Sequence, residues 1–557
     1  MRKCSSVGVV VGLLGIASVA ITSLSMASDT TARATTPARV RLMTNSQYAN
    51  TIAYMFGTDI SFRAPFSPRR RTEGLLASSA ASAGVTPSDM NQLQRSAAAI
   101  ASQVLESGDT SREVGHRDLL VPCKPADVEK ADDVCAAKFI SRTGRLLFRR
   151  PLEKQKLTEL VSQAHSAADT LGGFYAGLRV VLEGMLVDPL VLMVVDTTEP
   201  DPKHPDQRRL DAFSLASRLS YFLWDAAPDD AVLKSAESGE ILTAKGRAKV
   251  VDMMIASPRF KDGVRAFFDD MFAFDAFANL SKDAVTYPGI NAQTLADARE
   301  QTLLTVVDHL TTRNGDYRDL FTTRKTFISP ELALVYNIPT TPGWRPYEFP
   351  SDSPRIGILT QISFVASHAH PTRSSPTLRG KAMRELILCQ TVPPPPPNVD
   401  FSIIEDPNPR IKTIRDRLTA HRSNPVCAGC HKITDPIGLA LENFDGAGQY
   451  RETEKGAAID ISGNLDGKDF ATVAGLSEAV HDHPAVPSCL VRRLYSYGTG
   501  GPLAADDDAT ITEMTAQFAK AGYRVPNLMR AIASSSGFSN VTVDTTSSNA
   551  SSNGDQK

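Results

Sequence analysis

The chain has 557 residues, which is too long for one ordinary hydrophobic core and predicts about two to four domains. Its 60 Lys and Arg side chains nearly balance 62 Asp and Glu, for a net charge of −2. This balance gives no basic field for nucleic acid and no strong acidity of the kind that predicts disorder, so we expect a globular protein that does not bind nucleic acid.

The first residues are typical of an export signal. Arg2 and Lys3 precede an apolar run from Val7 to about Leu24, and Ser25-Met26-Ala27 supplies small residues for a signal peptidase. We therefore predict a signal peptide over residues 1–27 and a location in the periplasm or outside the cell. A retained anchor is the alternative, because the apolar run is about long enough to span a membrane. After signal removal we expect no transmembrane span.

Most of the remaining chain has the apolar spacing of helices. In the first of them, Thr44 caps the helix, Tyr48 and Ile52 belong to its apolar stripe, and Gly57 ends it. The predicted helices are Thr44–Phe56, Ser88–Gly108, Ala136–Phe148, Leu152–Ala167, Gly172–Leu186, Leu210–Leu223, Thr243–Ala256, Phe260–Phe274 and Asn291–Arg313. Short strands are expected only locally, near Val191–Asp196 and Ile459–Leu465. The expected fold class is mainly α, with several helical domains.

The predicted export makes it important how each cysteine is bonded, because an unpaired thiol is a liability in an oxidising compartment. Cys123 and Cys135 are close in sequence across a polar stretch, and we expect them to pair. With Cys427 and Cys430 assigned below, Cys389 and Cys489 remain, and parity predicts a second, long-range disulfide between them.

Two segments depart from the helical pattern. Val392–Pro397 is a polyproline stretch, which we interpret as a stiff connector; a docking ligand for an aromatic groove is the alternative. Residues 539–557 are rich in Ser, Thr and Asn and predict a disordered tail.

Cys427-Ala428-Gly429-Cys430-His431 has the spacing that attaches c-type haem. In a helical turn, positions i, i+3 and i+4 share a face, so both sulfurs can reach one porphyrin edge while His431 points at the iron. A thioredoxin-like pair would need a β–α–β context, and zinc would need a second ligand pair, for which His421 and a distant Cys are poor substitutes. We therefore predict one covalently bound haem c, with Cys427, Cys430 and the iron ligand His431.

The sixth iron ligand decides much of the chemistry of a haem. His368 and His370 are the preferred candidates, because two imidazoles in one short loop before a helix are unusual. The weaker candidates are His421, Met383, Met529, His481 and His483.

The chain resembles a large bacterial family, abundant in planctomycetes, myxobacteria and some proteobacteria, that is built from consecutive domains of unknown function 1587, 1595, 1592, 1588 and 1585. The segments that carry the resemblance are Ser374–Lys381, His421–His431 and Asp435–Asp445, together with Leu42–Tyr48, Phe148–Leu152, Arg218–Trp224 and Cys489–Gly498. The resemblance implies a secreted, mainly helical protein with a cytochrome c-like element in its C-terminal half. Members often carry Met shortly after the haem motif, where this chain has Ile433-Thr434.

Within this resemblance two further residues gain candidate roles. Arg379 is expected either to pair with a haem propionate or to form an ordinary surface ion pair. Asp435 is expected either to orient the ring nitrogen of His431 or to cap a helix. The expected division of the chain is a signal peptide (1–27), an N-terminal helical segment (40–110), a helical domain with the first disulfide (120–190), a central helical domain (205–340), a haem c-binding domain (355–465), a C-terminal helical domain (466–538) and a tail (539–557).

Three functions fit these patterns. The first is an extracytoplasmic haem protein that passes electrons within an oxidoreductase system, with a redox partner protein or a small-molecule or polymer substrate. The second is a haem peroxidase or oxygenase with an open sixth iron position. The third is an envelope binding or scaffold protein without catalysis, so the sequence leaves enzymatic activity undecided.

Overall fold

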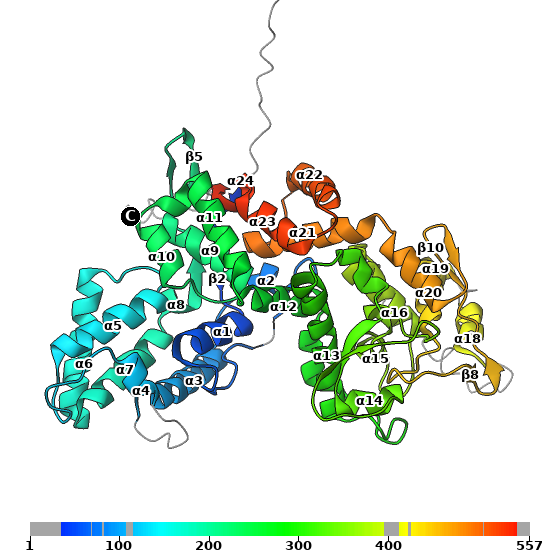
Figure 1. Cartoon of the computed structure of the whole chain (residues 1–557), viewed down its shortest axis with the longest axis horizontal. Coiled ribbons are helices and arrows are strands. Elements are labelled where there is room, and N and C mark those ends of the chain that lie inside the picture. Colours follow the sequence, from blue (N-terminus) through cyan, green and yellow to red (C-terminus); the bar gives the residue numbers. More distant parts are fainter. Residues whose placement is uncertain are drawn as a thin grey trace, which may run out of the picture. The chain divides into compact units, whose positions relative to one another are not determined.

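Helices dominate the computed structural model, which describes residues 35–67, 69–80, 83–106, 115–394, 412–421, 425–504 and 506–542 (Figure 1). The mainly α fold expected from the sequence is therefore confirmed. The expected signal peptide, Pro395–Pro397 of the polyproline stretch and residues 543–557 of the expected tail lie outside these residues.

Local capping chemistry sets the ends of the N-terminal helices. The Thr44 hydroxyl accepts the Gln47 N–H at 3.1 Å and starts the first helix, which ends at Gly57 with φ 127°. Asp132 caps Cys135 in the same way, so the helix expected from Ala136 begins earlier, at Asp133. The helices of this region are α1 (Asn45–Phe56), α2 (Leu76–Ser79), α3 (Pro87–Leu105), α4 (His116–Leu120), α5 (Asp133–Leu147), α6 (Lys154–Leu171), α7 (Phe174–Leu186) and α8 (Pro189–Leu192).

The central helices pack around buried aromatic side chains. Tyr221 and Trp224 are each 1% exposed, and the Trp224 indole N–H donates to the Met254 carbonyl at 2.9 Å. The helix expected over Asn291–Arg313 is α-helical only to Val307, and its last turn is π-helical. The elements are α9 (Ala212–Trp224), α10 (Asp230–Glu237), η2 (Glu240–Leu242), α11 (Ala244–Ala256), α12 (Phe260–Met271), η3 (Phe274–Asn279), α13 (Ala292–Val307), the π-helix η4 (Asp308–Thr312), η5 (Tyr317–Phe321) and α14 (Pro330–Tyr336).

The C-terminal third carries the Cys-x-x-Cys-His motif on α19, which packs closely against α16 (Figure 1). Its helical elements are η6 (Ile358–Thr360), α15 (Ile362–Ser367), α16 (Pro376–Ala382), the π-helix η7 (Met383–Ile387), α18 (Ile414–His421), α19 (Pro425–Gly438), η8 (Leu439–Leu441), α20 (Val473–His481), α21 (Ala485–Thr499), α22 (Asp507–Lys520), α23 (Val525–Ser534) and α24 (Ser536–Ser539).

A four-stranded sheet in the order β1-β12-β5-β4 joins both ends of the described chain. Thr36 pairs with Val541 in a parallel ladder, so the first residues of the expected tail are a strand and the prediction of disorder from 539 is wrong there. The sheet consists of β1 (Thr36–Pro37), β12 (Asn540–Thr542), β5 (His204–Leu210) and β4 (Thr198–Asp201). The two-stranded pairs are β2 (Val40–Leu42) with β3 (Met193–Val195), β6 (Lys325–Ile328) with β7 (Arg345–Glu348), β8 (Thr453–Glu454) with β9 (Ala457–Ala458), and β10 (Gly463–Leu465) with β11 (Lys468–Phe470).

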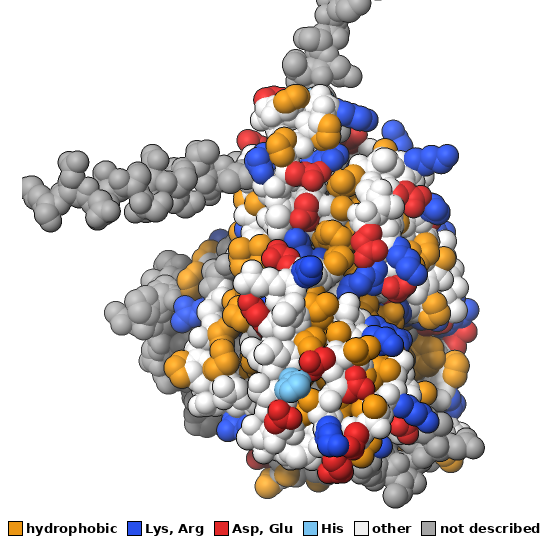
Figure 2. All heavy atoms as spheres, turned by 90° about the vertical axis from the view of Figure 1, so that its left-hand side faces the viewer, with side chains coloured by type: hydrophobic (Ala, Val, Ile, Leu, Met, Phe, Trp, Pro, Cys, Tyr) orange, Lys and Arg blue, Asp and Glu red, His pale blue; other side chains and the backbone are white. Residues whose placement is uncertain are grey.

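Two large hydrophobic clusters organise the core. One is built almost entirely from residues between Leu42 and Val194 and includes Cys135, whereas the other runs from Leu75 to Val541 and includes side chains of α9, α12, α16 and α21. Both expected disulfides are present, which confirms Cys123–Cys135, predicted from closeness in sequence, and Cys389–Cys489, predicted from parity. On the face of the molecule shown in Figure 2, acidic and basic side chains are interspersed. Within the described ranges, no helix has the length and apolar character needed to cross a membrane.

Candidate haem-binding site

The Cys-x-x-Cys-His motif lies in the first half of α19. Cys427, Cys430 and His431 therefore occupy positions i, i+3 and i+4 of one helix and share a face. All three side chains are partly exposed. The sulfurs of Cys427 and Cys430 are not bonded to each other, and they are the two cysteines of the described chain that lie outside a disulfide. The Cys430 sulfur lies 3.5 Å from the Pro393 carbonyl oxygen, at the start of the polyproline stretch.

A buried carboxylate holds the histidine of the motif. Asp435 is fully buried, and its Oδ2 lies 2.8 Å from Nδ1 of His431, one helical turn earlier. Its other oxygen, Oδ1, accepts the Thr377 hydroxyl of α16 at 2.9 Å. Of the two roles expected for Asp435, the structure thus supports the contact with the imidazole and not a helix cap.

Two glycines allow α16 and α19 to approach closely enough for this contact. A Cβ on Gly380 of α16 would lie 1.9 Å from the Thr434 carbonyl oxygen of α19. A Cβ on Gly438 of α19 would lie 1.8 Å from the Pro376 carbonyl oxygen of α16. Neither position has room for a side chain, so the spacing of the two helices, and with it the reach of Thr377 to Asp435, depends on glycine.

Arg384 of η7 links α19 to the β10–β11 hairpin, which follows α19 in the chain. Its Nε donates to the Ile433 carbonyl oxygen at 3.0 Å, and its Nη1 contacts both carboxylate oxygens of Asp466 at 2.8 Å. Asp466 lies in the β10–β11 turn and is also 3.0 Å from Nε2 of His483. The carboxylate of Asp466 therefore fixes Arg384, which in turn holds the helix just beyond His431.

Arg379 does not lie where a haem propionate or a surface partner would reach it. It is fully buried, and its guanidinium nitrogens contact the carbonyl oxygens of Leu441, Phe444 and Asp445, at 2.8, 2.7 and 2.6 Å. It also pairs with Glu442, which is 1% exposed, at 3.2 Å. Both expected roles of Arg379 are corrected, because the guanidinium joins α16 to the loop after η8 inside the core.

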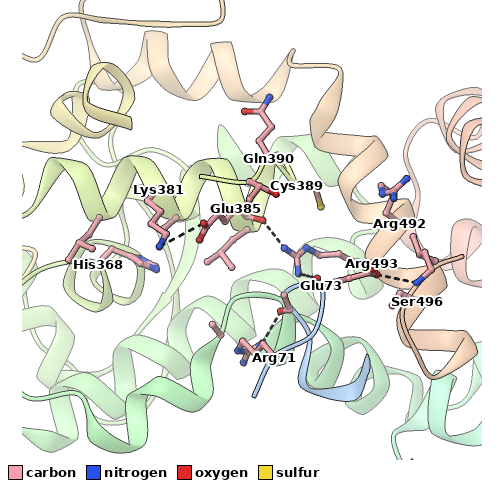
Figure 3. A pocket seen from close by; sticks show the side chains of 17 residues that line it. Arg71, Glu73, His368, Lys381, Glu385, Cys389, Gln390, Arg492, Arg493 and Ser496 are labelled. Carbon is pink, nitrogen blue, oxygen red and sulfur yellow. Dashed lines mark hydrogen bonds and ion pairs between the residues drawn. The ribbon is translucent and has the colours of Figure 1, made fainter. Parts of the chain in front are cut away.

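His368 lines a cavity of about 720 Å³ (Figure 3). Its Nδ1 lies 2.8 Å from the Phe364 carbonyl oxygen, and burial lowers the pKa of its imidazole to about 4. In Figure 3, His368 lies at one end of the cavity, and Arg492 and Arg493 of α21 lie at the other. The Arg493 guanidinium donates to the Glu73 and Glu385 carbonyl oxygens at 2.9 and 2.7 Å and so joins two walls.

The cavity and α19, the helix that carries Cys-x-x-Cys-His, contact different faces of α16 and η7. Thr377, Gly380 and Arg384 face α19, whereas Leu378, Lys381 and Glu385 line the cavity. At 100° per residue the two sets point in directions about 100° apart, so they lie on adjacent faces of the helix. His368 is thus on the cavity side, and His370 is exposed, with its carbonyl oxygen 3.2 Å from Lys282 Nζ.

Among the residues that the structure describes, no three His, Cys, Asp or Glu side chains are grouped as a metal site. A haem held by two imidazoles needs no such group of three, so His368 and His370 stay predictions for the sixth iron ligand.

The donors on α19 fit a covalently bound haem. Because Nδ1 of His431 is held by Asp435, Nε2 is the nitrogen through which the ring would bind iron. The sulfurs on the same helix face suit two thioether bonds. The motif also lies between α18 and η8 and not in the β–α–β unit of a thioredoxin-like redox pair.

The sequence did not indicate three parts of this site: Thr377, the glycine contacts between α16 and α19, and the cavity. Each involves residues that are distant in sequence, such as Thr377 and Asp435. Ser375-Pro376, a helix start, was the one local signal that placed Thr377 at a defined point of α16.

Taken together, the structure is that of a mainly helical, disulfide-bonded protein with a Cys-x-x-Cys-His motif on one helix. Five family models, each described as a protein of unknown function, match in succession: DUF1587 over residues 41–106, DUF1595 over 135–196, DUF1592 over 210–338, DUF1588 over 355–454 and DUF1585 over 466–538. The chain belongs to the family built from these five consecutive domains, which confirms the resemblance seen in the sequence. Neither the curated proteins nor the solved structures contain a match.

Proposed function

We propose that this protein carries one haem c, bound covalently by Cys427 and Cys430, and passes electrons outside the cytoplasm as part of an oxidoreductase system. The observation that carries the proposal is the bonding of the cysteines and the histidine of the motif. Its two cysteines remain outside any disulfide while the other four described cysteines pair, and its histidine is held through Nδ1 by a buried carboxylate.

The two disulfides support the proposed location outside the cytoplasm. Two disulfides in one chain are typical of an oxidising compartment, where c-type haem is also attached. The partner in electron transfer would be a redox protein or a small-molecule or polymer substrate.

Each residue of the site has a defined task in this proposal. Cys427 and Cys430 would fix the porphyrin edge along α19, and His431 would bind the iron through Nε2. Asp435 holds the imidazole in one orientation, and Thr377 holds Asp435. When bound, the haem supplies one-electron redox chemistry. The Gly380 and Gly438 contacts keep the helix that carries these donors at a fixed distance from α16.

The test is the mass and spectrum of the mature protein made in a host that attaches haem c. We expect the peptide with Cys427 and Cys430 to gain the mass of one haem, and the reduced protein to show a sharp c-type absorption band. The Cys427→Ala/Cys430→Ala variant should lose both signals.

The matched control is the Cys123→Ala/Cys135→Ala variant, which also removes two cysteines but leaves α19 intact. It should keep the haem mass and the spectrum. Wild-type protein without a haem mass on that peptide would rule out the proposed function.

A haem enzyme with an exchangeable sixth position is the second candidate, and the carboxylate on His431 fits it as well as it fits electron transfer. A strong acceptor on the ring nitrogen makes the imidazole a better electron donor to iron, which suits peroxide chemistry as well as electron transfer. Carbon monoxide separates the two candidates. A reduced spectrum that carbon monoxide does not change argues for electron transfer alone, and a changed spectrum argues for an accessible iron.

A further inference from the structure

The charge on Asp435 has no cationic side chain to offset it within the described chain. Its one recorded ion-pair partner there is His431, at 2.8 Å, and its other oxygen contacts the neutral Thr377 hydroxyl. Glu442, an equally buried carboxylate nearby, pairs with both Arg379 and Arg451, at 3.2 and 2.9 Å. The contrast shows that the protein neutralises one buried carboxylate with arginine and directs the other at an imidazole.

We infer that Asp435 is a positioning residue that lowers the reduction potential of the haem held by His431. The inference rests on the proposed function, because it requires haem at Cys427 and Cys430. Two physical effects both lower the reduction potential. The carboxylate accepts the Nδ1–H and so increases electron donation through Nε2, and its negative charge favours the more positive, oxidised iron.

The geometry for this effect is built into the fold. His431 and Asp435 are one turn apart on α19, which sets their separation, and Thr377 of α16 fixes the carboxylate from the other side. The Thr377 hydroxyl also moderates the effect, because a donor on Oδ1 draws charge away from Oδ2. Asp435 and Thr377 should therefore influence the potential in opposite directions.

The first variant is Asp435→Asn, which keeps the shape of the side chain and removes its charge. We expect a potential shift toward the reduced state, with at least a tenfold increase in the ratio of reduced to oxidised haem at fixed redox poise. For one electron, a tenfold change corresponds to 59 mV. The measurement is a potentiometric titration of the haem absorption, together with the iron–histidine stretching frequency, which should fall.

The matched control is Asp133→Asn. Asp133 Oδ1 lies 2.8 Å from Nδ1 of His165, so this change removes a carboxylate from a histidine that is neither in the haem motif nor a candidate iron ligand. In this control variant the ratio of reduced to oxidised haem should stay within twofold of the wild-type ratio.

The second variant, Thr377→Val, removes the hydroxyl and keeps the charge on Asp435. We expect a shift of at least twofold toward the oxidised state, opposite to that of Asp435→Asn. A merely structural loosening would move both variants the same way, and that result overturns the inference. An unchanged potential in Asp435→Asn also overturns the inference. If Asp435→Asn does not retain haem, an unchanged potential in Thr377→Val overturns the inference instead.

The haem mass of the wild-type peptide separates this inference from the proposed function. Without that mass the proposed function fails. With the mass present and the potentials unshifted, only the role of Asp435 fails.

Discussion

At the scale of single residues, burial decides what a charged side chain does. Arg379 and Lys381 are two positions apart on α16, yet Arg379 is fully buried among carbonyl oxygens and Lys381 is 41% exposed beside Glu385. Arg149 and Arg355 are also buried with carbonyl acceptors, so this chain repeatedly uses arginine to satisfy backbone groups in its core. Sequence alone could not separate Arg379 from an ordinary surface arginine.

The substitution Arg379→Met tests this role. It leaves Glu442 with Arg451 and the Ser374 hydroxyl and removes a donor from four carbonyl oxygens, so we expect the free energy of unfolding to fall by about 3–5 kcal/mol. Urea denaturation followed by circular dichroism measures the change. Lys381→Met is the matched control and should stay within about 0.5 kcal/mol of wild type. Equal stabilities of the two variants would contradict the structural role of Arg379.

At the scale of elements, the crossing of α16 and α19 depends on close backbone contact. The sequence predicted the helical Cys-x-x-Cys-His turn because its spacing is local. It did not predict the neighbour of that turn, because Gly380 and Thr434 are distant in sequence and nothing in their local patterns shows that they touch. The orientation of His431 depends on this neighbour through Thr377 and Asp435.

Gly380→Ala should force the two helices apart. The added Cβ would lie 1.9 Å from the Thr434 carbonyl oxygen, so we expect a loss of about 1–3 kcal/mol in the free energy of unfolding. Gly429→Ala is the control on α19 itself, where a Cβ meets no atom within 4 Å. Its higher helix propensity should leave stability unchanged or raise it by up to about 1 kcal/mol. Thermal unfolding of both variants distinguishes these outcomes, and a Gly380→Ala variant as stable as wild type would refute the close contact.

At the scale of the whole molecule, long-range links hold distant parts of the chain together. β1 and β12 pair residues from the two ends of the described chain, and Cys389–Cys489 closes the segment that contains the Cys-x-x-Cys-His motif. The long disulfide spans a sequence separation of 100, against 12 for Cys123–Cys135. A longer loop loses more conformational freedom on closure.

Removing the long disulfide should therefore cost more stability than removing the short one. We expect Cys389→Ser/Cys489→Ser to lower the free energy of unfolding by about 4–5 kcal/mol, and Cys123→Ser/Cys135→Ser by about 3 kcal/mol. Urea unfolding of the two double variants under identical conditions measures the difference. The reverse order of stabilities would show that loop length does not determine how much these disulfides stabilise the protein.

The sequence by itself determined what local chemistry and parity can specify. Helix caps such as Thr44, the two disulfides and the family were all predictable, and so was the Cys-x-x-Cys-His turn, because each depends on spacing, composition or counting. Only the tertiary structure decided the burial of Arg379, the cavity-side position of His368 and the hydrogen bond of Thr377 to Asp435. These depend on which helix faces meet, and burial and hydrogen bonding between distant segments arise only when the chain packs.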